Sequence, residues 1–185
     1  MTDMVEIIRG NIQADMSNRN GLAVENYSDL QKYAGNKYAA QKTETIASGG
    51  TNKYLLRTPN SSKRFLFNSN ITAEQGITAK VIENATITGS GTAITLYNLN
   101  RNSSNTCTMS RVAYGATSSG GTELPFSAIA GDIASAPRAT AIDFPVEPIE
   151  LDNNQDYIVE ITNRDAAETN DVKAIFMFIE DTPES

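Results

Sequence analysis

The residues best suited to chemistry lie in the stretch "NLNRNSSN" (98–105), where side-chain amides and hydroxyls surround one arginine. A guanidinium among such groups could clamp a carboxylate or a sugar. No carboxylate or aromatic residue is interleaved, although a catalytic or sugar-binding site would normally include one. Asx turns explain these residue types without any ligand. We therefore expect turn or inter-subunit hydrogen bonds here, with ligand binding as the alternative. The residues concerned are Asn100, Arg101, Asn102, Ser103 and Ser104.

The rest of the chain is poor in residues that carry out reactions. Histidine is absent, which removes the Ser-His-Asp and Cys-His relays and imidazole metal ligands. Cys107 is the only cysteine, and it lies among Thr and Met residues, so we expect an inert core thiol. The sequence therefore predicts that the protein is not an enzyme and needs no cofactor.

Two polar loops have oxygen-bearing side chains at spacings that calcium loops also use. "DNNQD" (152–156) alternates carboxylates and amides, but it lacks the EF-hand glycine and the distal bidentate glutamate. "DAAETND" (165–171) is a similar loop. We interpret both as turns and expect no metal site, with calcium or glycan binding left as an open alternative.

The first 48 residues differ from the rest in their pattern of apolar and polar residues, and they are expected to form an arm. "MVEIIRGNIQADMSN" (4–18) and "SDLQKYAGNKYAAQK" (28–42) have apolar residues at helical spacing, but too few to bury themselves without a partner. "ASGGTN" (47–52) is typical of a flexible joint. The expected arm is extended and partly helical, and certain apolar residues would bind a partner. These are Val5, Ile8, Ile12, Leu22, Val24, Leu30, Tyr33 and Tyr38.

Residues 49–185 consist of short alternating segments separated by turn residues, and they are expected to form the body. "GITAKVIENATIT" (76–88) alternates in the manner of a strand, and "GSG" (89–91) is a turn. "AIDFPVEPIELD" (141–152) contains two prolines, which favours an edge strand. The pattern predicts a mainly β fold, an antiparallel β-sandwich or jelly roll.

The last two segments give the clearest folding signal. In "LDNNQDYIVEITN" (151–163), Tyr157 at the start of a strand resembles the tyrosine corner of Greek-key sandwiches, whose hydroxyl bonds to upstream backbone. "AIFMFIE" (174–180) is nearly all apolar, which predicts a central strand or one buried on both faces, with Phe176 or Phe178 in the core.

Charge is spread unevenly along the chain. Residues 1–64 contain nine Lys or Arg and six Asp or Glu, whereas residues 65–185 contain six and 16. An acidic body argues against nucleic-acid binding, which needs concentrated positive charge. The basic segment 1–64 could dock on an acidic protein surface or could be a solvated tail. No apolar run approaches the length of a membrane span and no secretion signal is apparent, so no membrane partner is expected.

The order of several motifs resembles a family of tailed-bacteriophage virion proteins. The motifs are "YLLRTPNSSKRFLF", then "LYNLNRNSSNT", then "SSGGTEL", and a strand pair that ends in "MFIED". The resemblance covers roughly residues 50–185. The family usually ends in an aromatic strand with tryptophan, whereas this chain has Phe176 and Phe178 there.

The resemblance implies a structural virion protein that decorates or stabilises the capsid shell. It implies contact with the major capsid protein or another virion protein, a location on the capsid surface, and synthesis in the host cytoplasm. A homo-oligomer is expected, with a trimer favoured because capsid lattices offer three-fold sites. The alternative is a phage fibre or receptor-binding head that binds a host glycan or surface protein.

Overall fold

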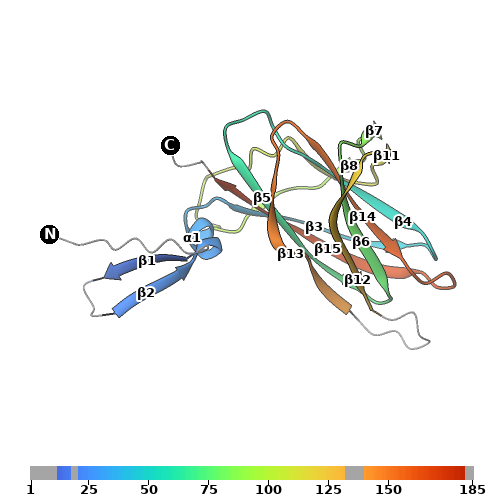
Figure 1. Ribbon diagram of the computed structural model, residues 1–185, viewed down its shortest axis with the longest axis horizontal. Helices are drawn as coiled ribbons and strands as arrows, with labels where there is room; N and C mark the ends of the chain where they lie inside the picture. The colour runs from blue at the N-terminus through green and yellow to red at the C-terminus, as the bar shows by residue number, and fades with distance from the viewer. Residues whose placement is uncertain (1–11, 18–20, 132–139, 182–185) are drawn as a thin grey trace.

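The structure is a computed structural model that describes residues 12–17, 21–131 and 140–181, with side chains from residue 27 onward except that of Val146. It is mainly β, with antiparallel sheets and one short helix (Figure 1). The mainly β prediction is therefore confirmed.

One large sheet has six strands in the order β12-β6-β14-β4-β10-β8. Its strands are β4 (Thr51–Arg57), β6 (Ile77–Glu83), β8 (Thr92–Ala93), β10 (Arg111–Tyr114), β12 (Thr122–Ala130) and β14 (Asp156–Asn163). The sequence pattern located β4, β6 and β14 well. β12 was not predicted, because it lies between the segments whose pattern indicated strands.

The other large sheet has five strands in the order β13-β5-β15-β3-β9. Its strands are β3 (Lys37–Ile46), β5 (Arg64–Ala73), β9 (Tyr97–Asn98), β13 (Thr140–Leu151) and β15 (Asn170–Asp181). β13 is an edge strand, as its prolines predicted, and its pairing with β5 shifts register between Phe144 and Ile149, where both prolines lie. β15 is central, as its apolar run predicted.

The main core lies between the two sheets, which gives a sandwich-like body. β5 alternates strictly between buried and half-buried residues, as expected for a strand with one face inward. Phe67, Phe176 and Phe178 are fully buried, and Tyr54 of the opposite sheet packs against Phe176 with ring centroids 4.9 Å apart. Phe67 and Phe178 are 5.5 Å apart. The predicted core positions of Phe176 and Phe178 are confirmed.

A smaller apolar cluster lies on the outer face of the six-stranded sheet. It is centred on Leu55, Ala113 and Ile158. A two-stranded ribbon of β7 (Thr86–Gly89) and β11 (Thr117–Ser119) adjoins it. Burial on both faces explains why β14 is buried almost throughout.

Tyr157 forms the predicted corner. Its side chain is buried, and its hydroxyl accepts a hydrogen bond of 2.8 Å from the backbone N–H of Asp152. Burial is the main cause that raises the pKa of this phenol. The bond closes the 152–156 turn, so that segment is a turn at the start of β14, as interpreted from the sequence.

Ion pairs between strands use the basic residues of segment 53–64. The basic residues of 53–64 face acidic residues of β14 and β15, and three of the four pairs are direct register partners. The pairs are Lys53 with Glu160, Arg57 with Asp156, Lys63 with Glu180, and Arg64 with Asp181. Four of the nine basic residues of segment 1–64 are therefore used inside the body, while Arg9 and Arg19 lie outside the described residues.

The N-terminal region also differs from the expectation. Residues 12–17 and 21–26 form a hairpin of β1 (Ile12–Ser17) and β2 (Gly21–Asn26), not a helix. Helix α1 (Tyr27–Tyr33) follows and overlaps the first part of the second predicted helical segment, 28–42. Residues 37–46 belong to the body as β3, which pairs with β15 along its length. The boundary at residue 48 is therefore wrong, and 47–50 is a turn between β3 and β4, in which Gly50 N–H bonds Ala47 O at 2.9 Å.

Candidate functional site at the root of the hairpin

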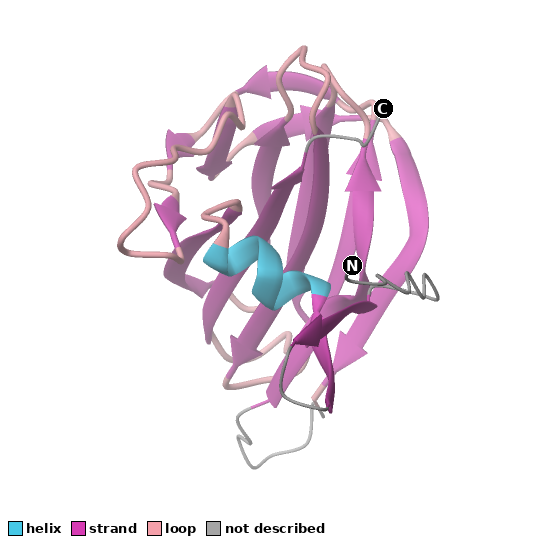
Figure 2. Ribbon diagram, turned by 90° about the vertical axis from the view of Figure 1, so that its left-hand side faces the viewer, coloured by secondary structure: helices cyan, strands magenta, loops and turns pink. Residues whose placement is uncertain are grey.

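Helix α1 joins the hairpin to the body, and it depends on contacts with other elements. Seven residues are too few for a helix that is stable alone. The last carbonyl groups of any helix also lack partners within it. Residues outside the helix must therefore supply those partners and fix the direction in which the hairpin leaves the body (Figures 1 and 2).

The amide side chains of residues 98–105 cap the C-terminal end of α1. Asn100 Nδ2 donates to the carbonyl of Tyr33 at 2.8 Å. Asn98 Nδ2 donates to the carbonyl of Gly35 at 2.9 Å. Asn105 Nδ2 donates to the carbonyl of Ala34 at 3.3 Å. The polar stretch thus satisfies carbonyl groups that would otherwise be left without partners.

The same stretch holds its own shape through turns. Asn100 N–H bonds Asn98 Oδ1 at 2.8 Å, and Asn102 N–H bonds Asn100 Oδ1 at 3.1 Å. Ser103 Oγ accepts from Asn105 N–H at 3.1 Å. The predicted turn bonds are confirmed for Asn100, Asn102 and Ser103, while inter-subunit bonds stay a prediction.

Gly35 makes this packing possible. Its φ of +78° lies in the left-handed region that glycine adopts most readily. A Cβ at this position would lie 2.1 Å from Ser103 Oγ. The loop therefore packs against the helix end only because this residue has no side chain.

The N-terminal end of α1 is fixed to β15 and β3. The Tyr27 hydroxyl donates to the carboxylate of Asp181, which also accepts a 2.9 Å bond from Arg64 Nη2. Burial, followed by the bond to Asp181, raises the pKa of Tyr27. Lys37 Nζ donates to the hydroxyl of Ser28. We call these contacts, together with the cap from residues 98–105, the α1 junction.

The predicted arm residues fall into three groups. Val5 and Ile8 lie outside the described residues, and Ile12, Leu22 and Val24 lie in β1 and β2, where the structure describes only the backbone. On α1, Leu30 is half-buried and Tyr33 is exposed. Tyr38 is buried in β3, so its assignment to partner binding is wrong.

Arg101 and Ser104 are exposed. Sequence reasoning also missed Tyr27, Lys37 and Asp181 as members of the α1 junction. Tyr27 and Asp181 lie 154 positions apart in the sequence, so no local pattern could have revealed their contact.

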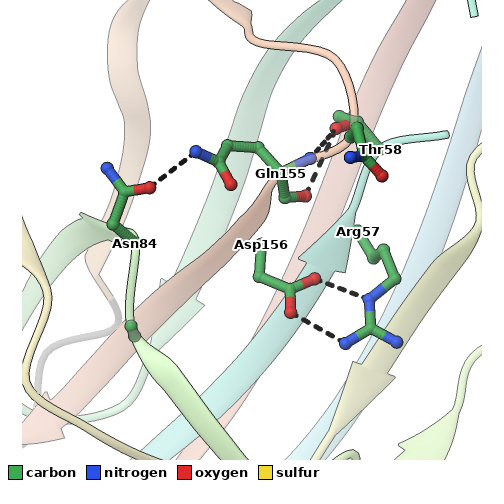
Figure 3. Close-up of a pocket in the computed structure, with 7 residues that line it drawn as sticks. Arg57, Thr58, Asn84, Gln155 and Asp156 are labelled. Carbon is green, nitrogen blue, oxygen red and sulfur yellow. Dashed lines mark hydrogen bonds and ion pairs between the residues drawn. The ribbon is translucent and has the colours of Figure 1, made fainter. Parts of the chain in front are cut away.

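A polar hollow lies at one end of the body, beside the turn before β14 (Figure 3). Arg57 and Asp156 form a bidentate pair, with Nε–Oδ1 at 2.6 Å and Nη2–Oδ2 at 2.7 Å. The bond to Asp156 raises the pKa of Arg57. Gln155 Nε2 donates to Asn84 Oδ1 at 2.5 Å, and Gln155 N–H donates to Thr58 Oγ1 at 2.9 Å. These side chains hydrogen-bond one another, so the hollow is lined by a hydrogen-bonded turn.

A second polar hollow adjoins the α1 junction. Its lining includes Lys63, Asn105, Thr106 and Glu180. The nearly buried carboxylate of Glu180 pairs with Lys63 and accepts a 2.7 Å bond from Thr108 N–H. The hollow offers amide and hydroxyl groups of the kind that bind sugars, beside a charge pair that is already neutralised.

The remaining sequence candidates show no reactive arrangement within the described residues. Burial raises the pKa of the Cys107 thiol to about 12, so it is protonated at neutral pH and poorly nucleophilic. No cluster of three or more potential metal ligands occurs in the part of the chain that the structure describes. Within that same part, no helix has the length and apolar character needed to cross a membrane.

Comparison with known proteins adds no relationship. Neither the protein-family models nor the curated proteins include a match to the chain.

Proposed function

We propose that the protein is a structural component of a tailed-phage virion that decorates or stabilises the capsid shell. The observation that carries the proposal is the β1–β2 hairpin, which stands away from the body and is attached through the α1 junction (Figure 1). A projecting hairpin whose base is held to the body by the α1 junction is suited to attaching the protein to a larger surface. The motif order of residues 50–185 supports the same role.

We further infer that the body is a jelly roll. Numbering β3, β4, β5, β6, β12, β13, β14 and β15 from one to eight, the five-stranded sheet contains the order 6-3-8-1 and the six-stranded sheet 5-4-7-2. Consecutive strands alternate between the two sheets except for strands four and five, which pair in the six-stranded sheet, and two Greek keys produce this order. Viral capsid and lectin domains both use this architecture, so it supports the proposal and its alternative alike.

The hairpin is the part expected to bind the shell. A two-stranded hairpin is marginally stable alone in water. Its register pairs apolar residues, with Ala14 opposite Val24 and Met16 opposite Leu22. Cross-strand pairs of this kind gain stability when an apolar partner surface covers them. The partner in this proposal is the major capsid protein or another virion protein, and the copies form a homo-oligomer, with a trimer favoured.

The proposal assigns no catalytic role and no cofactor to the chain. This rests on the missing histidine, the protonated Cys107 and the mutual hydrogen bonding around Arg57 and Asp156. Purified protein should therefore show no turnover of glycans, peptides or phosphoesters. Turnover abolished by one Asp or Glu substitution would overturn this part of the proposal.

Co-purification with virions, followed by localisation on the particle, tests the proposal directly. Purified protein should bind empty capsids of the phage that encodes it, because a decoration protein needs only the shell. Its absence from virions and failure to bind empty capsids would contradict the proposal.

The alternative is a receptor-binding head, and the hollow lined by Lys63, Asn105, Thr106 and Glu180 favours it. A protein of that class would bind host cells and glycans in the absence of any capsid. Thr106→Ala would then weaken cell binding and leave particle binding unchanged.

A further inference from the structure

The hollow beside the α1 junction gathers polar groups whose hydrogen-bonding capacity the protein does not use. The hydroxyls of Tyr38, Ser104 and Thr106 make no hydrogen bond with any residue that the structure describes, and all three residues line the hollow. The side chain of Asn105 donates to Ala34 and Asn36, but its oxygen accepts no bond in that part of the chain. The hollow has a volume of about 380 Å³, within the range of about 300–1,000 Å³ that is usual for ligand pockets.

Tyr38 is the most deeply buried of these hydroxyl-bearing residues, with 3% of its surface exposed. It takes an inward-facing position of β3 opposite Phe178 of β15. Glu180, two positions further along β15, is therefore its diagonal neighbour on the same face, and it lines the hollow as well. Burial, followed by the negative charge of Glu180, raises the pKa of the Tyr38 phenol to about 12. Because a buried tyrosine hydroxyl normally has a hydrogen-bond partner, this unused hydroxyl indicates a ligand in the hollow.

The charged groups of the hollow favour a neutral ligand. The nearly buried carboxylate of Glu180 pairs with Lys63, and it also accepts the 2.7 Å bond from Thr108 N–H. A cationic ligand would meet the ammonium group of Lys63. An anionic ligand would meet the carboxylate of Glu180 in a chain whose net charge is −7.

We propose that the hollow binds one neutral sugar unit through the hydroxyls of Tyr38 and Thr106 and the ion pair of Lys63 with Glu180. Sugar hydroxyls both donate and accept hydrogen bonds. The lining matches them, because its hydroxyls do the same, its ammonium group donates and its carboxylate accepts. Tyr38 is the only aromatic residue in the lining and its ring is buried, so no ring is available for stacking. The Kd should therefore be about millimolar.

This site is a function beyond capsid decoration, and it does not depend on attachment to a capsid. It also gives the receptor-binding alternative a ligand class and adds Tyr38 to the residues that would bind the ligand. Binding to empty capsids is a separate measurement, so this inference and the proposed function fail independently.

An NMR titration of isotope-labelled full-length protein with glucose, galactose and mannose, one at a time, tests the site. At least one sugar should shift the backbone amide signals of Asn105, Thr106 and Thr108 in a saturable manner. Tyr38→Phe keeps the buried ring and should weaken binding by at least about threefold, as expected for the loss of one hydrogen bond. Tyr97→Phe is the matched control, because Tyr97 is exposed and lies outside the lining, and it should bind as wild type does.

Thr106→Val is a second variant whose folding is not at risk, because Thr106 is exposed, and it should also weaken binding by at least about threefold. The uronic acid of the sugar that binds, in which a carboxylate replaces the terminal CH₂OH group, should bind more weakly than the neutral sugar. The proposal would be overturned if none of the three sugars gave a saturable shift up to about 50 mM, well above a millimolar Kd. Wild-type affinity in both hydroxyl variants, or a uronic acid that binds as tightly as its neutral sugar, would overturn it as well.

Discussion

At the scale of single residues, the hydroxyl of Tyr157 closes the turn before β14. Tyr157→Phe removes the bond to Asp152 N–H and should lower the free energy of unfolding by about 1 kcal/mol. Urea unfolding at neutral pH measures the change. Tyr97→Phe is the control, because Tyr97 is exposed and its substitution should have little effect. Equal losses for both variants would show that the corner contributes nothing specific.

Glu160 gives the protein a pH dependence whose sign can be stated. Burial raises the pKa of its carboxyl, but hydrogen bonds from Lys53 and Lys80 outweigh burial, and the pKa is lowered overall. A carboxyl with a lowered folded-state pKa contributes stability above its unfolded value of about 4.3. That contribution is lost as the pH falls through the folded-state pKa.

Glu160→Gln should therefore cost about 1–3 kcal/mol of unfolding free energy at pH 7, as expected for hydrogen bonds to a charged group. The difference from wild type should shrink as the pH falls below about 4. Glu123→Gln is the control, since Glu123 is an exposed partner of Lys80 at 3.4 Å and should contribute under about 1 kcal/mol. A difference that grows towards acid pH would contradict the assignment.

At the scale of elements, the cap on α1 is the contact that positions the hairpin. Asn100→Ala removes the donor to the Tyr33 carbonyl and the acceptor for Asn102 N–H. Amide hydrogen exchange within α1 should accelerate by about three- to tenfold, which corresponds to a local loss of about 0.5–1.5 kcal/mol. Asn102→Ala is the control, because Asn102 is exposed and takes part only through its backbone N–H. Unchanged amide exchange in the Asn100 variant would show that Asn100 does not stabilise α1.

The elements that the sequence predicted are those whose signals are local. The alternation of β5 and β6, the prolines of β13 and the tyrosine of β14 all lie within a few residues of what they determine. The strand β3 was missed because charged residues, Lys42 and Glu44, occupy two of its inward-facing positions. Lys42 Nζ lies 3.7 Å from the Tyr114 ring centroid, and Glu44 accepts a bond from the buried Tyr54.

The polar stretch 98–105 was correctly interpreted as a turn, but its partner was not foreseen. The contact between Asn100 and Tyr33 spans 67 positions. Residue types alone show that a loop can donate hydrogen bonds, whereas the fold decides which carbonyl groups receive them. The same limit applies to charge, because the basic residues of 53–64 look like a free patch until the strand register pairs them.

At the scale of the whole molecule, the protein consists of a β-sheet body and a projecting hairpin. The body begins by Lys37, because β3 is an inner strand between β15 and β9. Removing residues 1–48 would therefore delete a core strand, and that truncated chain should fail to fold. A cut that spares both α1 and β3 is needed to test the hairpin.

Deletion of residues 1–26 is the most direct test of the proposed attachment. The shortened chain keeps Tyr27, α1 and every strand of both large sheets. It should melt as the full chain does, and it should no longer co-sediment with empty capsids of the encoding phage, whereas full-length protein does. A folded chain lacking residues 1–26 that still decorates those capsids at full occupancy would contradict the account, because attachment would then belong to the body.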